Sequence, residues 1–348
     1  MVADDEIVVL HDRLEALAVR VLVAMGTPDD VAREVAGHLV EADLMGVPSH
    51  GCMRLAQYPD WAEQGLFDPS GLSTPYTAAG GRTLIDGGDG FGIPSIRLAV
   101  DTAIGEARAG SGMSAVGITN TGHTGRIGAF AERAAAAGFF TVILGGGSGR
   151  EWPQVVPFGG AEGRLPTNPY ALGIPGGDRG PVVLDFATSA GAGGKVYAAS
   201  YSGRALPEGL CVDVNGRPTT DPADYVAGGA LLPMAGPKGF GLAVIAEMMG
   251  RALLGDVRSG LSWLVLVIDV EGFSTPDIYR REAEDLLDEI RTCPPAPGFE
   301  RVEIPGERER EIAEERRSTG IPIPRATLEA VRDRARSLGL SDADLTGI

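Results

Sequence analysis

Residues 113–149 have the sequence MSAVGITNTGHTGRIGAFAERAAAAGFFTVILGGGSG, and this stretch decides the predicted fold. Its apolar run at 113–119 predicts a strand, its glycines at 121–125 a turn, and its alanines at 127–137 a helix. A second strand at 139–144 ends in three glycines and Ser148. Further strands at 83–86, 182–185 and 262–269 and helices at 95–109, 239–254 and 276–291 continue the alternation, which indicates an α/β domain.

Both ends of the chain have a helical pattern instead. Apolar residues at helical spacing predict a helix over 7–25, and Thr27-Pro-Asp-Asp30 begins a second helix that ends near Met45. A third helix would carry Arg54, Leu55 and Tyr58. Charged helices are predicted over 307–317 and 325–337.

The composition excludes several classes of function. A formal charge of −17 argues against a nucleic-acid partner and against an anionic membrane surface. The longest apolar run, 263–268, is too short to span a bilayer. The cysteines at 52, 211 and 293 form neither a disulfide framework nor a metal-binding pair, and the N-terminus lacks a signal-peptide pattern. We therefore expect a globular, cytoplasmic protein without a metal centre.

Scarce ionisable residues point to candidate sites. Lys195 and Lys238 are the only lysines, beside 28 arginines (30 Lys+Arg minus these two), and there are four histidines. Both lysines, like His50 and His123, lie among glycines in predicted turns. A compact ammonium retained in an arginine-rich chain suggests a specific need, although codon bias would leave the same pattern.

The segment Ser49-His-Gly-Cys-Met-Arg54 suits hydride transfer. On a helix start, His50 and Arg54 would share one face because they are four residues apart. A histidine that exchanges a proton, beside an arginine that binds a carboxylate, fits chemistry at a 2-hydroxy or 2-keto acid. Ser49 could orient the imidazole ring. The alternative is that His50 only caps the helix.

Other glycine-rich turns are candidate ligand sites, and each also has a purely structural interpretation. Residues 122–128 would place His123 and Arg126 at a helix N-terminus, which is a natural site for a cofactor phosphate. The alternative is that this segment is only a turn that caps the helix. Residues 167–169 and 185–189 would end strands or loops, where an open α/β sheet binds ligands. Residues 88–92 do not match the Rossmann fingerprint, and there is no P-loop motif. A hydrolase using Cys52 would lack the usual nucleophile elbow.

Together these segments resemble the malate/L-lactate dehydrogenase family of NAD(P)-dependent oxidoreductases. The family includes malate, sulfolactate, ureidoglycolate and diketogulonate dehydrogenases and piperideine- and pyrroline-2-carboxylate reductases. The similar segments follow the family order across nearly the whole chain: 49–51 with Arg54 and Tyr58, 122–129, 132–135, 138, 157–160, 167–169, 174–175, 185–189, 194–196, 206–207, 218–222, 237–239 and 304–307.

The resemblance implies an α/β fold with a non-Rossmann cofactor domain around a mixed sheet. Residues 1–75 would form a helical N-terminal part that packs with C-terminal helices in 307–348, and residues 76–306 would bind cofactor and substrate. It implies a homodimer or a higher homo-oligomer. It also implies that hydride passes between the nicotinamide of NAD or NADP and C2 of a small 2-hydroxy or 2-keto acid.

The resemblance also carries residue roles. His50 would donate or accept the proton with Ser49 in its relay, although some family members give this role to the histidine that corresponds to His123. Arg54 would bind the substrate carboxylate, and Thr167 would contact the substrate. The implied cofactor contacts are His123, Thr124, Gly125, Arg126, Ile127, Ser148, Asp185, Phe186, Ala187, Lys238, Pro305, Gly306 and Glu307.

Three departures from the family pattern bear on specificity. Residues 164–166, Arg-Leu-Pro, precede Thr167 where the family usually has a glycine, and Cys52 replaces a common valine. Imine-reducing members have an acid in the relay, and Lys195 occupies the neighbourhood where that acid is expected. This favours a hydroxy acid over a cyclic imine. A cyclic-imine reductase and a ligand-binding protein without turnover remain the alternatives.

Overall fold

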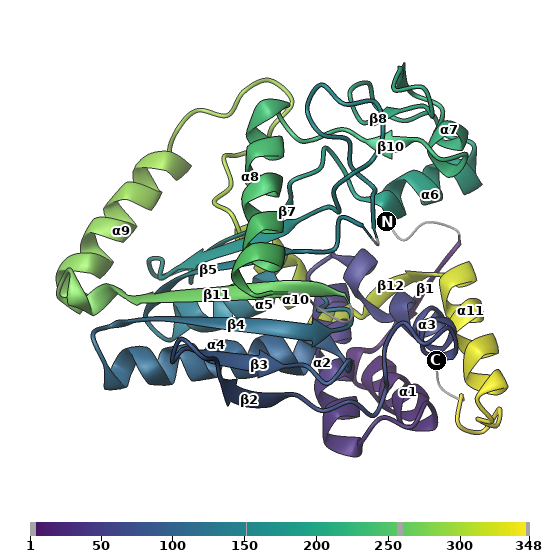
Figure 1. Ribbon diagram of the computed structural model, residues 1–348, viewed down its shortest axis with the longest axis horizontal. Helices are drawn as coiled ribbons and strands as arrows, with labels where there is room; N and C mark the ends of the chain where they lie inside the picture. The colour runs from purple at the N-terminus through teal and green to yellow at the C-terminus, as the bar shows by residue number, and fades with distance from the viewer. Residues whose placement is uncertain (1–4, 151, 256–259, 346–348) are drawn as a thin grey trace.

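The computed structural model describes residues 5–150, 152–255 and 260–345, and a mixed seven-stranded sheet forms its centre (Figure 1). Strands β3 and β4 pair in parallel, whereas the other neighbours pair antiparallel. A Rossmann sheet is mostly parallel, so the predicted mixed, non-Rossmann α/β fold is confirmed. The strand order is β2 (Thr74–Thr77), β3 (Thr83–Asp86), β4 (Met113–Thr121), β11 (Leu261–Asp269), β5 (Phe139–Gly146), β6 (Pro169–Ile174) and β7 (Val182–Ala187).

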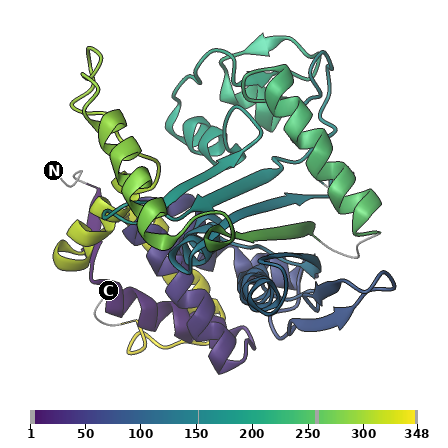
Figure 2. The ribbon, with the colours of Figure 1, turned by 90° about the vertical axis from the view of Figure 1, so that its left-hand side faces the viewer.

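Helices cover both faces of the sheet because its central strands are apolar on both sides (Figure 2). Ile143 and Val265 belong to the main core, with α4 (Gly92–Ala109) and α5 (Gly128–Ala136). Their neighbours Leu144 and Leu264 join a separate cluster with α8 (Pro237–Met248), which continues into a π-helix at Met249–Leu253. Successive side chains of a strand point to opposite faces, so a strand covered on both sides has a continuous apolar sequence.

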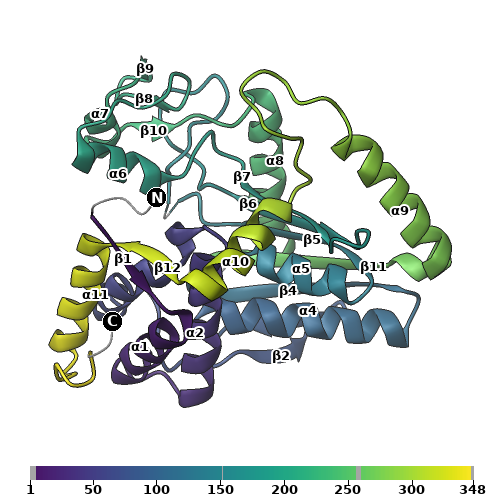
Figure 3. The ribbon, with the colours of Figure 1, turned by 180° about the vertical axis from the view of Figure 1, so that it is seen from behind.

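The two ends of the chain meet beside this sheet (Figure 3). Strand β1 (Glu6–Val9) pairs antiparallel with β12 (Ile321–Pro324). Helix α2 (Asp29–Leu44) packs on α1 (His11–Ala24) and on α10 (Glu307–Thr319), while α11 (Arg325–Ser337) packs on the 3₁₀ helix η2 (Cys52–Ala56). The helix predicted over 7–25 is therefore wrong in its first turn. Residues 6–9 form a strand because their partner comes from the far end of the chain.

The proposed boundaries at 75 and 306 stay a prediction, and residues 1–4 and 346–348 lie outside the described ranges. The buried core around the N-terminal helices is continuous with the core under the sheet. Apolar side chains of α1, α2, α4 and α5 share this core. The helical part and the sheet thus stabilise each other.

The third predicted helix is wrong as a continuous element. Residues 48–63 form two 3₁₀ helices, η1 (Pro48–His50) and η2 (Cys52–Ala56), followed by α3 (Tyr58–Glu63). Gly51 separates η1 from η2 in an extended conformation, with φ −92° and ψ −158°. The buried Asp43 carboxylate accepts the Cys52 N–H at 2.7 Å, and a Cβ on Gly51 would overlap this carboxylate. A tertiary contact therefore breaks the helix.

A small unit lies above the sheet in Figure 1. It consists of the strands β8 (Cys211–Val212), β9 (Pro218–Thr219) and β10 (Ala230–Leu231) with α6 (Gly193–Ser202) and α7 (Pro222–Val226). Helix α9 (Pro276–Arg291) follows η4 (Val270–Gly272) at the opposite end of the molecule. None of the helices in the described residues has the length and apolarity needed to cross a membrane.

Candidate active site

Two histidines and a tyrosine form a hydrogen-bonded chain. His50 Nδ1 lies 3.3 Å from His123 Nε2 with the rings stacked, and His123 Nδ1 lies 2.9 Å from the Tyr58 hydroxyl. His50 ends η1, Tyr58 begins α3, and His123 follows β4. Both ring nitrogens of His123 are thus engaged. In the described part of the chain, no hydrogen bond involves Nε2 of His50.

The surroundings keep this chain neutral. Burial, followed by the charges of Arg54 and Arg126, lowers the pKa of His50 to about 4. Burial, followed by the charge of Arg54, lowers the pKa of His123 well below its usual value. Burial also raises the pKa of the Tyr58 phenol, whose side chain is fully buried. At neutral pH both imidazoles are therefore uncharged and the phenol keeps its proton.

The Arg54 side chain bonds to the Ser49 backbone just before it in the chain and does not share a helix face with His50. Its Nε donates to the Ser49 carbonyl at 2.8 Å and its Nη1 to Gln57 Oε1 at 2.7 Å, while its guanidinium carbon lies 5.6 Å from the Trp61 ring centre. The shared helix face predicted for His50 and Arg54 is wrong, because Gly51 interrupts the helix. The contact uses the Ser49 carbonyl, so a role for its hydroxyl stays a prediction.

A cavity of about 370 Å³ lies in front of His50. It brings together eight of the predicted site residues: Ser49, His50, Arg126, Asp185, Phe186, Ala187, Pro305 and Gly306. The other predicted residues are not among its lining: Arg54, His123, Thr124, Gly125, Ile127, Ser148, Thr167, Lys238 and Glu307. Lys195, which the sequence marks by its scarcity and by the family-like segment 194–196, also lines this cavity.

The amides before α5 are already used by protein groups. The Arg126 N–H donates to His38 Nε2 at 3.0 Å, and the Gly128 N–H donates to Asp185 Oδ2 at 2.7 Å. These amides are therefore not free to bind a cofactor phosphate. The Arg126 side chain keeps that capacity, because its buried Nε has no hydrogen-bond partner and its guanidinium lines the cavity. Neither spacing nor composition marks His38, which lies inside the regular pattern of α2.

Glu247 is a second residue that the sequence analysis missed. Its carboxylate accepts the N–H groups of Gly147 at 2.7 Å and Gly149 at 3.1 Å, and Asn168 Nδ2 at 2.9 Å. It thereby fixes the loops that carry Ser148 and Thr167. The Ser148 hydroxyl and Asn168 Oδ1 are buried and have no hydrogen-bond partner within the described ranges, so a polar ligand there would satisfy them.

The two segments expected to end strands or loops lie differently in the sheet. Thr167 and Asn168 end the loop before β6, and residues 185–189 include the carboxyl end of β7 at Ala187. The rule that ligands bind at the carboxyl ends of strands applies to parallel sheets, whereas β5, β6 and β7 pair antiparallel. The cavity nevertheless includes Asp185, because β7 is the edge strand beside η1 and α10.

Glu307 and Lys238 are among the predicted cofactor contacts that lie outside the cavity. The buried Glu307 carboxylate pairs with Arg291 at 2.7 Å and accepts the Ile304 N–H at 3.3 Å. It therefore fixes the loop of Pro305 and Gly306, which do line the cavity. Lys238 is exposed in the first turn of α8. Roles for Glu307 and Lys238 at the cofactor stay predictions.

Cys52 does not have the properties of a nucleophile. Its side chain is buried, and burial together with the neighbouring Asp43 raises the pKa of the thiol well above its usual value. A reactive cysteine needs the opposite, an accessible group with a lowered pKa. The hydrolase alternative therefore has no support from this site.

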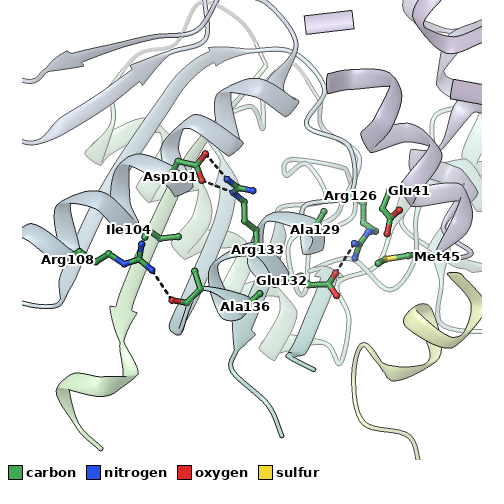
Figure 4. A pocket seen from close by; sticks show the side chains of 11 residues that line it. Glu41, Met45, Asp101, Ile104, Arg108, Arg126, Ala129, Glu132, Arg133 and Ala136 are labelled. Atoms are coloured by element: carbon green, nitrogen blue, oxygen red, sulfur yellow. Dashed lines mark hydrogen bonds and ion pairs between the residues drawn. The ribbon is translucent and has the colours of Figure 1, made fainter. Parts of the chain in front are cut away.

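A larger cavity of about 640 Å³ lies between α2, α4 and α5 (Figure 4). Figure 4 shows Arg126 directed at Glu132, with 3.4 Å between Nη2 and Oε2, and Arg133 paired with Asp101. Arg126 and Glu132 line both cavities, but the larger one has no histidine in its wall. The smaller cavity has eight of the predicted site residues in its wall, among them His50, so it is the candidate active site.

Comparisons with known proteins agree with this geometry. The malate/L-lactate dehydrogenase family model matches residues 9–332. Hydroxycarboxylate dehydrogenase B of Escherichia coli K12 is 33% identical over 97% of this chain and 94% of its own length. Ureidoglycolate dehydrogenase (NAD(+)) of the same strain is 33% identical over 85% of this chain and 87% of its own. The structure of malate dehydrogenase from Pyrococcus horikoshii OT3 superposes with a TM-score of 0.86, at 31% identity and 98% coverage of both chains.

Proposed function

The chain belongs to the malate/L-lactate dehydrogenase family, and from this premise we propose that His50 is the acid/base of its reaction. The protein is an NAD(P)-dependent oxidoreductase that transfers hydride between nicotinamide and C2 of a small 2-hydroxy or 2-keto acid. The observation that supports His50 is that its Nε2 has no hydrogen-bond partner among the described residues. Both nitrogens of His123 are engaged, whereas His50 lines the cavity with one ring nitrogen available.

Each residue has a distinct task in this proposal. The nicotinamide supplies or accepts the hydride. His50 exchanges the proton of the C2 oxygen, and Arg54 binds the substrate carboxylate with the guanidinium hydrogens that Ser49 and Gln57 leave free. Thr167 contacts the substrate from the loop fixed by Glu247. Orientation of the two reactants then provides much of the rate enhancement.

The unsatisfied polar atoms support a bound dinucleotide. The Arg126 Nε and the Ser148 hydroxyl are buried without partners, and both belong to the implied cofactor contacts. A phosphate or a sugar hydroxyl would satisfy them. We propose that residues on the cavity wall hold the cofactor together with Ser148, namely Arg126, Asp185, Phe186, Ala187, Pro305 and Gly306. NAD and NADP both remain candidates.

The proposal is tested by following nicotinamide absorbance in a matrix of 2-keto acids and cyclic imines, with NADH and with NADPH. We expect oxidation of one reduced cofactor by a small 2-keto acid. Turnover of cyclic imines alone would replace the keto-acid substrate with the imine alternative. Binding of neither cofactor, measured by quenching of protein fluorescence, would contradict the proposed site.

Replacing Arg54 with lysine should mainly weaken substrate binding. Lysine cannot donate at once to Ser49, Gln57 and a carboxylate, because its ammonium lacks the forked geometry of guanidinium. A charged hydrogen bond contributes about 1.5–3 kcal/mol, so we expect KM for the keto acid to rise roughly 10- to 100-fold. Steady-state kinetics should show a smaller change in kcat and in KM for the cofactor.

The matched control is Arg317→Lys, an exposed arginine of α10 that pairs with Glu41. It should leave KM for the keto acid unchanged. An Arg54→Lys enzyme with unchanged KM for the substrate would remove Arg54 from carboxylate binding.

The family resemblance also leads us to propose a homodimer or a higher homo-oligomer and a cytoplasmic location. The three cysteines are free thiols, which suits a reducing compartment. Light scattering during gel filtration tests the assembly, and a monomer at micromolar concentration would contradict it.

A further inference from the structure

The hydrogen-bond chain behind His50 ends at the Tyr58 hydroxyl, which has no task in the proposed reaction. The Tyr58 side chain is fully buried, in edge contact with Phe67 and Phe91. Among the described residues, its hydroxyl has a single hydrogen-bond partner, His123 Nδ1 at 2.9 Å. A buried phenol that keeps its proton must donate it, because an unsatisfied buried donor is costly. The Tyr58 hydroxyl therefore donates to His123 Nδ1.

This direction fixes the tautomers of both histidines. With Nδ1 as an acceptor, a neutral His123 carries its proton on Nε2 and donates it to His50 Nδ1. A neutral His50 must then carry its own proton on Nε2, the free nitrogen of a residue that lines the cavity. Each donor in the chain thus points toward the cavity, and His50 presents an N–H group there.

We propose that Tyr58 is the terminal proton donor of a relay, Tyr58 to His123 to His50, that lets a neutral His50 act as an acid. The proposal rests on the assignment of His50 as the residue that protonates the C2 oxygen. Tyr58 acts through two other residues and is in this sense a positioning residue. It sets which nitrogen of His50 bears the proton and replaces that proton when it leaves.

The proton balance closes over one reduction. As hydride reaches C2, the C2 oxygen takes the proton from His50 Nε2, His50 Nδ1 takes that of His123 Nε2, and His123 Nδ1 takes the phenolic proton. One O–H bond forms on the product and the O–H bond of Tyr58 breaks. An alkoxide is a stronger base than a phenolate, so this direction is favourable. After product release, His50 Nε2 takes up one proton from the solvent, which is the proton that the reduction consumes, and the relay resets in reverse.

The wild-type protein tests the tautomers directly. The chain has four histidines, so ¹⁵N-labelled imidazoles give four ring systems, which single His→Gln variants assign. We expect His123 and His50 to be protonated at Nε2. His38 is an internal reference for the opposite tautomer, because its Nε2 accepts a backbone N–H and its proton must lie on Nδ1. A proton on Nδ1 of His123 would overturn the proposal.

Tyr58→Phe tests the relay while it keeps the ring in place. We expect kcat for the keto acid to fall roughly 10- to 100-fold, with KM for substrate and cofactor nearly unchanged. The imidazole spectrum should lose the single tautomer of His123. Tyr279→Phe is the matched control, because its hydroxyl donates to the Pro175 carbonyl at 2.7 Å and neither residue lines the cavity. Unchanged kcat and tautomers in Tyr58→Phe would overturn the relay.

The relay and the assignment of His50 can fail separately. If His50→Ala retains turnover while the wild-type tautomers are as expected, the assignment of His50 is wrong, and with it the relay as a catalytic device. If His50→Ala is inactive and Tyr58→Phe behaves as wild type, the assignment of His50 stands and the relay alone is wrong. A Tyr58→Phe protein that does not fold leaves the wild-type tautomers as the deciding measurement.

Discussion

Replacing His50 with alanine should lower kcat about 10²- to 10⁴-fold, the range that positioned acid/base groups supply. His50 lines the cavity, and its Nε2 has no hydrogen bond among the described residues. His123 lies behind it and is not among the residues that line the cavity, so the nitrogen that the variant frees on His123 is poorly placed to take over. Hydride transfer without proton delivery leaves an alkoxide in a partly buried site, which is the main source of the lost rate.

Cofactor affinity separates this effect from a loss of folding. The His50→Ala enzyme should bind reduced cofactor with a Kd within about twofold of wild type, because the implied cofactor contacts come from other segments. His11→Ala, at the start of α1, is the matched control and should retain full activity. An enzyme that lacks His50 but keeps its turnover would exclude it as the acid/base.

The sequence predicted the sheet well because the relevant signals are local. The strands at 113–121, 139–146 and 261–269 are apolar runs between glycines, and the helices between them have regular spacing. By contrast, β1 at Glu6–Val9 was read as helix, because its only partner is β12 at the other end of the chain. The break at Gly51 was missed for a similar reason, since the side chain of Asp43 on α2 causes it.

The residues of the candidate site also divide into those that local sequence marks and those that only tertiary contacts reveal. His50, His123 and Arg126 were found because scarce or charged residues among glycines are conspicuous. His38 and Glu247 were missed, although they hold the turn before α5 and the loops of Ser148 and Thr167. Both lie on regular helices, where neither spacing nor composition marks them. Their roles depend on contacts with residues at least 79 positions away.

The buried histidines should make the protein unstable at mildly acid pH. Burial, then the charge of Arg126, lowers the pKa of His38 to about 3, while that of His50 falls to about 4 and that of His123 well below its usual value. An unfolded chain protonates all three near pH 6.5, whereas the native state does not. Below that pH unfolding takes up protons, so the free energy of unfolding falls as the pH falls.

Asp43 opposes part of this trend. Burial raises the pKa of its carboxyl to about 6, so the native state takes up its proton earlier than the unfolded chain does. This carboxyl therefore favours the native state as the pH falls from about 6 toward 4. Burial also raises the pKa of the Asp185 carboxyl, which acts in the same direction as Asp43. Three histidines against these two carboxyls leave a net uptake of about one to two protons on unfolding. Each proton changes stability by about 1.4 kcal/mol per pH unit, so we expect a loss of about 1.4–3 kcal/mol per unit between pH 6 and 5.

Urea unfolding at pH 7, 6 and 5 measures this slope, in a range where most surface carboxylates remain ionised. The His38→Gln variant isolates one contribution, because a glutamine amide oxygen can still accept the Arg126 N–H but does not titrate. In this variant unfolding should take up about one proton fewer, so its free energy of unfolding should change with pH by about 1.4 kcal/mol per unit less than in wild type. A wild-type stability that stays constant from pH 7 to 5 would mean that the histidines already carry protons in the native state. Such a result would also contradict a neutral His50 and remove the physical basis of the relay that ends at Tyr58.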